Sequence, residues 1–281
     1  MKNIVVGIDF SNSSLNALKH AIAISLKTQG KLHLVWVKTP STTNKAAKEE
    51  IKQITKKAQA ALAELIADCK KEAPKSVINS IILEGKAPVE LTKYAANLQD
   101  SIIVIGTHGM SGDDTFAGSN AMKTVGMSSV PILILRENVK INRDLVQILA
   151  PIDTSFETLQ KMKSVVAIAK AFAAKVLVLG LNAPPIAEVK HTIKVQLKHA
   201  GKMCDDAIVR NAAATIDIKG NVAQAVIEFA KNQDVNLIAV MREEEDDFSN
   251  FWMGSATRQL VNNTPMPLLV IPNVTYFSVS K

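Results

Sequence analysis

Apolar positions along the first 140 residues follow two alternating periods. Continuous apolar runs, which are typical of strands buried on both faces, occur at Lys2–Ile8, Lys31–Val37, Val77–Leu83, Ser101–Ile105 and Pro131–Leu135. Apolar residues at helical spacing occur between these runs, at Ser13–Leu26, Asn44–Lys71 and Pro88–Leu98. A further short helix is predicted before the last strand. This alternation predicts an α/β fold whose parallel sheet has its ligand crevice at the carboxyl ends of the strands.

The second half of the sequence repeats the first. LVQILAPIDTS corresponds to NIVVGIDFS and aligns Asp153 with Asp9, at an offset of 144 residues. Further matches, at offsets of 135 and 136 residues, pair Gly85 with Gly220, Gly118-Ser119 with Gly254-Ser255, and Pro131 with Pro267. Several landmarks in one order predict a tandem duplication, with domains at 1–140 and 141–281 that join near Glu137–Arg143.

Composition narrows the class of protein. Hydrophobic residues make up 47% and charged residues 21%, as in ordinary globular chains, and aromatic residues only 4%, which argues against a stacking platform for nucleic acid. The first domain carries a net charge of +6 and the second +1, almost all from lysine, which we interpret as a solvated face. No apolar run is long enough to span a membrane, and the first residues read as a strand, not a signal peptide. Cys69 and Cys204 make no disulfide framework, which favours a cytoplasmic location.

A glycine-rich segment, GTHGMSGDDTFAGS at 106–119, follows the fourth strand and leads to a helix. Glycines let backbone N–H groups approach an anion closely, and a helix N-terminus near Ser119 adds its dipole. Asp9 ends the first strand and can accept a hydrogen bond from a ribose or an adenine, whereas Val37 can offer backbone groups to an adenine edge. Together these features outline a nucleotide site that is neither a P-loop nor a dinucleotide fingerprint.

With these residues the sequence resembles the universal stress protein family in its tandem two-domain form. The resemblance rests on GIDFS at 7–11, the glycine segment ahead of VPILIL and the degenerate second copy, and it covers nearly the whole chain. It implies two tandem five-stranded parallel-sheet domains of a Rossmann-like, adenine nucleotide alpha hydrolase-like type, packed through their last strands as a pseudo-dimer. It also implies a site for ATP, built from Asp9, Val37, Gly106, Gly109, Gly118 and Ser119. His108 lies between the loop glycines and fits either a surface spacer or a contact with the phosphates.

The sequence departs from the family pattern at both loops. Eight residues separate Gly109 from Gly118 where the pattern has nine, and two of them are Asp113 and Asp114. These carboxylates either repel the phosphates or hold a bridging Mg²⁺. In the second domain, Met241-Arg-Glu-Glu244 stands in place of the paired glycines and an acidic run follows. We therefore expect ATP, with Mg²⁺, in the first domain only.

The function that these residues indicate is a regulatory binding protein of the stress response. The alternatives are a slow ATPase that uses the same site and an interaction protein that binds no nucleotide. We prefer binding to catalysis because the spacing of the residues supports no catalytic pairing. We expect an unidentified protein partner and a homodimer of the tandem chain, but neither nucleic acid nor a membrane. His20, His33, His191 and His199 are expected to pack or face solvent rather than bind a metal. Asp9 and Asp153 also fit a structural role in bracing the first turn.

Overall fold

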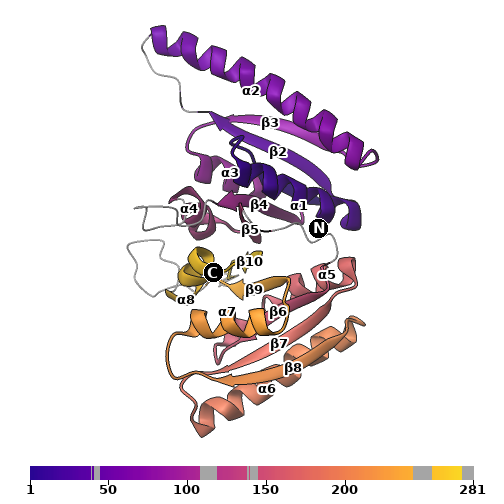
Figure 1. Cartoon of the computed structure of the whole chain (residues 1–281), viewed down its shortest axis with the longest axis vertical. Coiled ribbons are helices and arrows are strands. Elements are labelled where there is room, and N and C mark those ends of the chain that lie inside the picture. The colour runs from indigo at the N-terminus through magenta and orange to yellow at the C-terminus, as the bar shows by residue number, and fades with distance from the viewer. Residues whose placement is uncertain are drawn as a thin grey trace, which may run out of the picture. The chain divides into compact units, whose positions relative to one another are not determined.

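The computed structural model describes residues 1–38, 40, 45–107, 119–137, 139, 145–242 and 255–273. The chain divides into two compact units, Met1–Arg143 and Asp144–Lys281. Each is an α/β layer structure with a parallel sheet, as the sequence predicts (Figure 1). The predicted packing of the last strands concerns how the units are placed relative to one another, and it stays a prediction.

The first unit follows the predicted order of strands and helices. Its elements are β1 (Asn3–Gly7), α1 (Asn12–Thr28), β2 (Lys31–Lys38), α2 (Lys45–Glu72), β3 (Ile78–Glu84), α3 (Ala87–Ala96), β4 (Ser101–Thr107), α4 (Ser119–Met127) and β5 (Ile132–Arg136). The strands are parallel and lie in the order β3-β2-β1-β4-β5. The chain therefore changes direction across the sheet between β1 and β4, which is where ligands of open α/β sheets bind.

The second unit repeats this plan with one added element. Its elements are β6 (Gln147–Ile152), the 3₁₀ helix η1 (Phe156–Leu159), α5 (Met162–Phe172), β7 (Lys175–Asn182), α6 (Ala187–Asp206), β8 (Asn211–Asp217), α7 (Val222–Asn232), β9 (Leu237–Met241), α8 (Ser255–Asn263) and β10 (Leu268–Ile271). Its strands lie in the order β10-β9-β6-β7-β8, again parallel.

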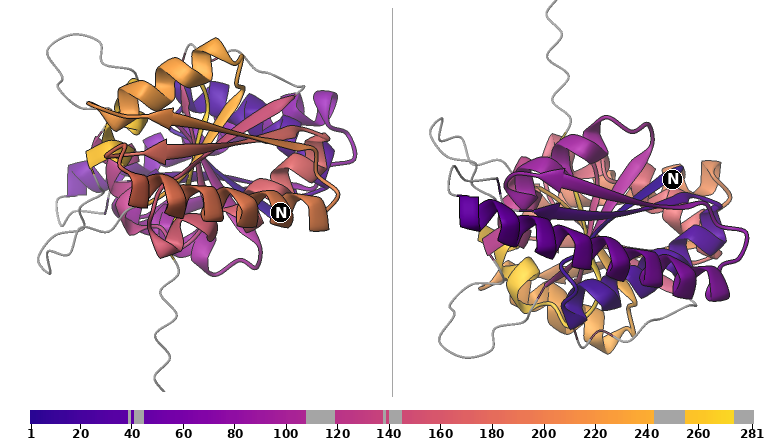
Figure 2. Two further views of the ribbon diagram at one scale, coloured as in Figure 1. Left: turned by 90° about the horizontal axis from the view of Figure 1, so that it is seen from below. Right: turned by 90° about the horizontal axis from the view of Figure 1, so that it is seen from above.

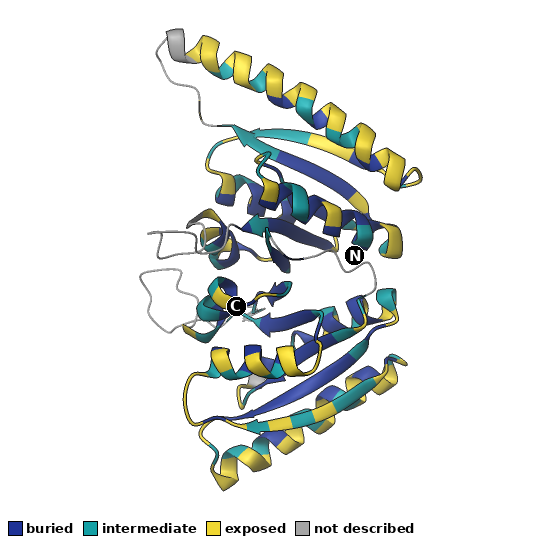
Figure 3. Cartoon of the chain, viewed as in Figure 1, coloured by how far each residue is buried: buried dark blue, intermediate teal, exposed yellow. Residues whose placement is uncertain are grey.

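Burial follows from the position of each strand in its sheet. In the first unit, Ile4, Val5 and Val6 of the central β1 are fully buried, whereas most residues of the edge strand β3 are half-buried or exposed. Helices cover both faces: Figure 2 shows α2 on one side of β2 and β3, and α3 on the other. The outer side of α2 is exposed from residue 48 onward (Figure 3). The continuous apolar runs are thus explained by strands covered on both faces.

The start of the first helix differs between the units, and so does the residue at the position of Gly106. The register aligns Gly106 of β4 with Met241 of β9. In the first unit, α1 begins at Asn12 and its first turn lies directly against Gly106. In the second unit, the matching turn is the 3₁₀ helix η1, and α5 begins only at Met162. Gly106 leaves room for the regular first turn of α1, and Met241 stands at the matching position of β9.

Candidate nucleotide site

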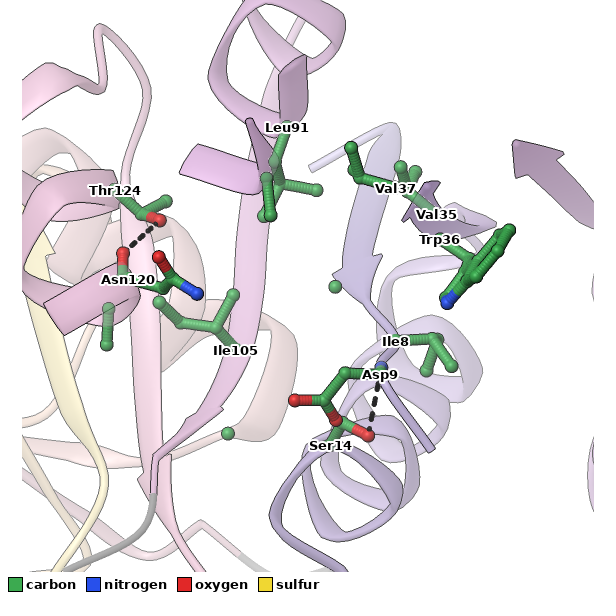
Figure 4. A pocket seen from close by; sticks show the side chains of 14 residues that line it. Ile8, Asp9, Ser14, Val35, Trp36, Val37, Leu91, Ile105, Asn120 and Thr124 are labelled. Atoms are coloured by element: carbon green, nitrogen blue, oxygen red, sulfur yellow. Dashed lines mark hydrogen bonds between the residues drawn. The ribbon is translucent and has the colours of Figure 1, made fainter. Parts of the chain in front are cut away.

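A cavity opens at the carboxyl edge of the first unit's sheet, at the change of direction between β1 and β4. Its volume is about 150 Å³, a size that accepts a single aromatic ring. Residues from β1, β2, β4, α1, α3 and α4 surround it (Figure 4). They are Gly7, Ile8, Asp9, Ser14, Val35, Trp36, Val37, Ala87, Leu91, Ile105, Gly106, Asn120, Ala121 and Thr124.

The wall of this cavity is apolar where the sheet and α3 meet. Side chains alternate along a strand, so Val35 and Val37 face the cavity whereas Trp36 points to the opposite face of the sheet. Leu91 of α3 and Ile105 of β4 complete the apolar wall, and both are buried. A flat ring that enters here exchanges water for aliphatic contacts on two sides, which is favourable.

The backbone of Val37 faces the cavity because β1 is shorter than β2. The N–H of Ile8 donates to the carbonyl oxygen of Val35 at 2.9 Å, so the polar groups of Val35 point toward β1. Residues two apart in a strand point their backbone groups the same way, and the pairing with β1 ends at Val35. The N–H and C=O of Val37 therefore point past the end of β1, where they can pair with the edge of a bound ring.

Asp9 leaves β1 at the floor of the cavity and is held by a local turn. Its Oδ1 accepts hydrogen bonds from the Ser11 N–H at 3.0 Å and from the Ser11 hydroxyl at 2.5 Å. Its own N–H donates to the Ser14 hydroxyl at 3.4 Å. The carboxylate is exposed, and it points into the cavity (Figure 4). The turn fixes the direction of this carboxylate before any ligand arrives.

Asp153 makes the same turn in the second unit. Its Oδ1 accepts from the Ser155 N–H at 2.9 Å and the Ser155 hydroxyl at 2.6 Å, and its N–H donates to the Thr158 hydroxyl at 3.2 Å. Because the arrangement recurs in both units, the structural role that the sequence left open is present at Asp9 as well as at Asp153. A role in ligand binding is additional to it.

Gly106 has a packing role that the sequence did not indicate. It belongs to β4 rather than to a loop, and a Cβ at this position would overlap the backbone of Ser13 in the first turn of α1. The glycine therefore allows α1 to lie close to β4, and it also lines the cavity. His108, Gly109 and Gly118 lie outside the described residues. Ser119 is the first residue of α4, and its side chain is likewise not described.

Two polar residues near this edge were missed by the sequence analysis. Asn120, in the first turn of α4, lines the cavity and is exposed. Arg136 ends β5 beside Thr107, its Nε is buried without a hydrogen-bond partner among the described residues, and burial lowers its pKa. Asn120 directly follows the Gly-Ser pair at the start of a predicted helix, so the sequence pattern could have identified it. The position of Arg136 beside Thr107 could be found only from the pairing of β4 with β5.

The remaining candidate residues have structural surroundings. His20 and His33 are buried, and burial lowers the pKa of both. Cys69 and Cys204 are buried free thiols, and burial raises the pKa of each to about 11. The described residues contain no cluster of ligands that could hold a metal ion. Within the same residues, no helix has the length and apolar character needed to cross a bilayer.

Comparisons with known proteins bear on the family and the fold. Residues 1–136 and 146–272 each match the model of the universal stress protein family. A stretch of 150 residues, half of the chain, is 28% identical to the universal stress protein MJ0531 of Methanocaldococcus jannaschii and covers 84% of that protein.

Solved structures share the fold over nearly the whole length. A universal stress protein from Archaeoglobus fulgidus matches with a TM-score of 0.78 at 16% identity, covering 97% of this chain and 98% of the other. A protein of unknown function from Pseudomonas aeruginosa, PA1789, matches with a TM-score of 0.66 at 16% identity, covering 97% and 93%. At such identities the likeness concerns the fold alone.

Proposed function

The chain belongs to the universal stress protein family, and from this premise we propose that its first unit binds ATP, together with Mg²⁺, as a regulatory ligand. The observation that carries the proposal is the cavity at the carboxyl edge of β1, β2 and β4. It brings Asp9, Val37 and Gly106, three residues that the sequence predicts for the site, around one space of the size of an aromatic ring.

Each wall of the cavity suits one part of the nucleotide. The adenine ring lies against Val35, Leu91 and Ile105, with its edge at the backbone groups of Val37. The ribose hydroxyls lie near the Asp9 carboxylate, which accepts hydrogen bonds. The phosphates extend toward the start of α4, where the N–H groups of a first helical turn favour an anion. This pose uses the family-like residues Asp9 and Val37 and directs the phosphates to the first turn of α4.

We expect one nucleotide per chain, in the first unit. The second unit has Met241 at the position of Gly106, and its first helical turn is replaced by η1. In sequence, Met241 leads into an acidic run, Glu243 to Asp247, where the first unit has its glycines. Negative charge and bulky side chains both disfavour a triphosphate there.

Binding rather than turnover is the expected role. Asp9 is the one titratable side chain among the described residues that line the cavity, and its Oδ1 is occupied by Ser11. A general base and a cation aimed at the γ-phosphate are what phosphoryl transfer requires. Nucleotide contacts with residues 106–119 would change the surface that the first unit offers to a protein partner. The alternatives, a slow ATPase and an interaction protein without nucleotide, differ from this proposal in measurable ways.

Mass spectrometry of nucleotide released from freshly purified, denatured protein tests the proposal most directly. We expect an adenine nucleotide at one equivalent or less per chain. Titration calorimetry with ATP and Mg²⁺ should then give one site, lost in Gly118→Val and retained in Gly254→Val, the matching change in the second unit. Phosphate release above background would favour the ATPase, and the absence of ATP binding to the wild-type chain would favour the nucleotide-free interaction protein.

A further inference from the structure

Asn120 is the polar side chain opposite Asp9 in the cavity. It is the second residue of α4, it is exposed, and it lines the cavity. Figure 4 shows its amide and the Asp9 carboxylate pointing toward the same space from opposite sides. Its backbone carbonyl accepts a hydrogen bond from the Thr124 hydroxyl at 2.6 Å, whereas its side-chain amide bonds to no other described residue. The amide thus faces the cavity.

The surroundings of Asn120 select a negatively charged group. N–H groups in the first turn of a helix have no acceptor within the helix, and the dipole makes that end favourable for an anion. The amide NH₂ of asparagine adds donors without adding charge. Because Asp9 faces the sugar in the proposed pose, the next group along the ligand, the phosphate attached to the ribose, reaches Asn120.

We propose that Asn120 donates its side-chain N–H to the phosphate attached to the ribose and so makes the cavity select nucleotides over nucleosides. This inference rests on the proposed function and assigns part of its specificity to one residue of this chain. The second unit supplies the structural comparison, because Ala256 occupies the equivalent second position of α8. A helix of this type therefore begins normally without an amide at that position, and Asn120→Ala should fold.

The sharpest test replaces the amide by a carboxylate of the same shape. Asn120→Asp puts a negative charge in the first turn of α4, which favours the helix, but it removes the donor and repels a phosphate. Stability and phosphate binding should therefore change in opposite directions. Ala256→Asp places the same charge at the matching position of the second unit and serves as the control.

Affinities for ATP, AMP and adenosine would be measured by titration calorimetry on the full chain. We expect Asn120→Ala to weaken ATP and AMP about tenfold or more, because a hydrogen bond to a charged group is lost. Asn120→Asp should weaken them further at an unchanged or higher melting temperature. Adenosine should bind all variants alike, and Ala256→Asp should behave as the wild type.

The outcomes separate this inference from the proposed function. If the wild-type chain binds ATP and both Asn120 variants bind it equally well, the assignment of Asn120 is wrong and the nucleotide site stands. If Asn120→Ala weakens adenosine as much as ATP, the residue contacts the nucleoside and the phosphate assignment is overturned. If the wild-type chain binds none of the three ligands, the proposed function itself fails.

Discussion

Gly106 lies directly against Ser13, so that a Cβ on Gly106 would overlap the Ser13 carbonyl group and stand 2.7 Å from the backbone nitrogen of Ser14. The atoms that a side chain would meet are backbone atoms of a helix, which do not move aside by rotation about a side-chain bond. The glycine is therefore required by the packing of α1 on β4, whether or not a ligand is present.

Gly106→Ala should destabilise the protein by about 2–3 kcal/mol, the upper part of the range for overpacked cores. Urea denaturation followed by circular dichroism would show this as a lower midpoint. Gly220→Ala is the control, because a Cβ there meets no atom within 4 Å, and its midpoint should stay the same or rise slightly. Equal midpoints for both variants would contradict the close packing of α1 on β4.

The shared turn at Asp9 and Asp153 allows the structural and binding roles of Asp9 to be separated. Asp9→Ala and Asp153→Ala each remove two hydrogen bonds to a serine, and we expect each to cost about 1–2 kcal/mol of stability. Only Asp9→Ala should also weaken ATP binding, measured by calorimetry. Equal binding by the two variants would show that Asp9 serves the turn alone.

The fold was predictable because its signals are local. Continuous apolar runs such as that of β1 and helical spacing such as that of α1 need no knowledge of distant contacts, and the repeat supplied each signal twice. Asp9 and Val37, each of which directly follows or ends a predicted strand, both line the cavity. The strand order, with its change of direction between β1 and β4, brings these residues to one edge of the sheet.

The rest of the site depends on contacts between distant segments. The role of Gly106 is set by Ser13, 93 positions earlier in the sequence, and nothing in the glycine pattern indicates that approach. Arg136 comes beside Thr107 only through the register of β4 and β5. Sequence patterns record neither kind of contact.

The end of α6 offers a stabilising substitution. Ile208 is 91% exposed and has φ +58°, a left-handed conformation that strains a β-branched residue. It occupies the usual glycine position of a Schellman motif, with hydrogen bonds from Val209 N–H to Cys204 and from Ile208 N–H to Asp205. Ile208→Gly should raise stability by about 0.5–1 kcal/mol, since relief of strain exceeds the entropy cost of glycine.

Thermal or urea unfolding would measure this gain. Ala173→Gly at the end of α5 is the matched control, because Ala173 also has a positive φ, of 53°, but no branched side chain. Its gain should be smaller than that of Ile208→Gly. A loss of stability in Ile208→Gly would mean that the isoleucine side chain makes contacts that outweigh its backbone strain.

Stability should fall below about pH 6.5 because of two buried histidines. Burial is the main cause that lowers the pKa of His33, with Lys31 second, and burial also lowers the pKa of His20. The Nε2–H of His33 donates to Asn3 Oδ1 at 3.0 Å, so the neutral ring accepts a hydrogen bond at Nδ1 from the Tyr94 hydroxyl at 2.9 Å. Asn3 in turn donates through Nδ2 to the Gln99 carbonyl at 2.8 Å, which directs its Oδ1 toward His33.

The sign follows from proton binding in the two states. Between the lowered native pKa and the unfolded value of 6.5, the unfolded chain binds more protons than the native one, so stability rises with pH in this window. The contribution of the two neutral histidines to stability is fully present above pH 6.5 and is lost as the pH falls toward their lowered native pKa. Asp217, whose pKa is lowered first by the hydrogen bond from Lys190, acts only near and below its ordinary value of 3.8 and does not interfere.

Urea unfolding from pH 7.5 down to pH 5 would measure this dependence. His33→Gln cannot take up a proton, so it should lower stability at pH 7.5, where the hydrogen bonds of the ring are lost, yet show a smaller further loss toward pH 5. His191→Gln, at an exposed position on α6, is the control and should keep the full slope of the wild type. A slope in His33→Gln equal to that of the wild type would show that His33 is protonated as easily in the folded protein as in the unfolded chain.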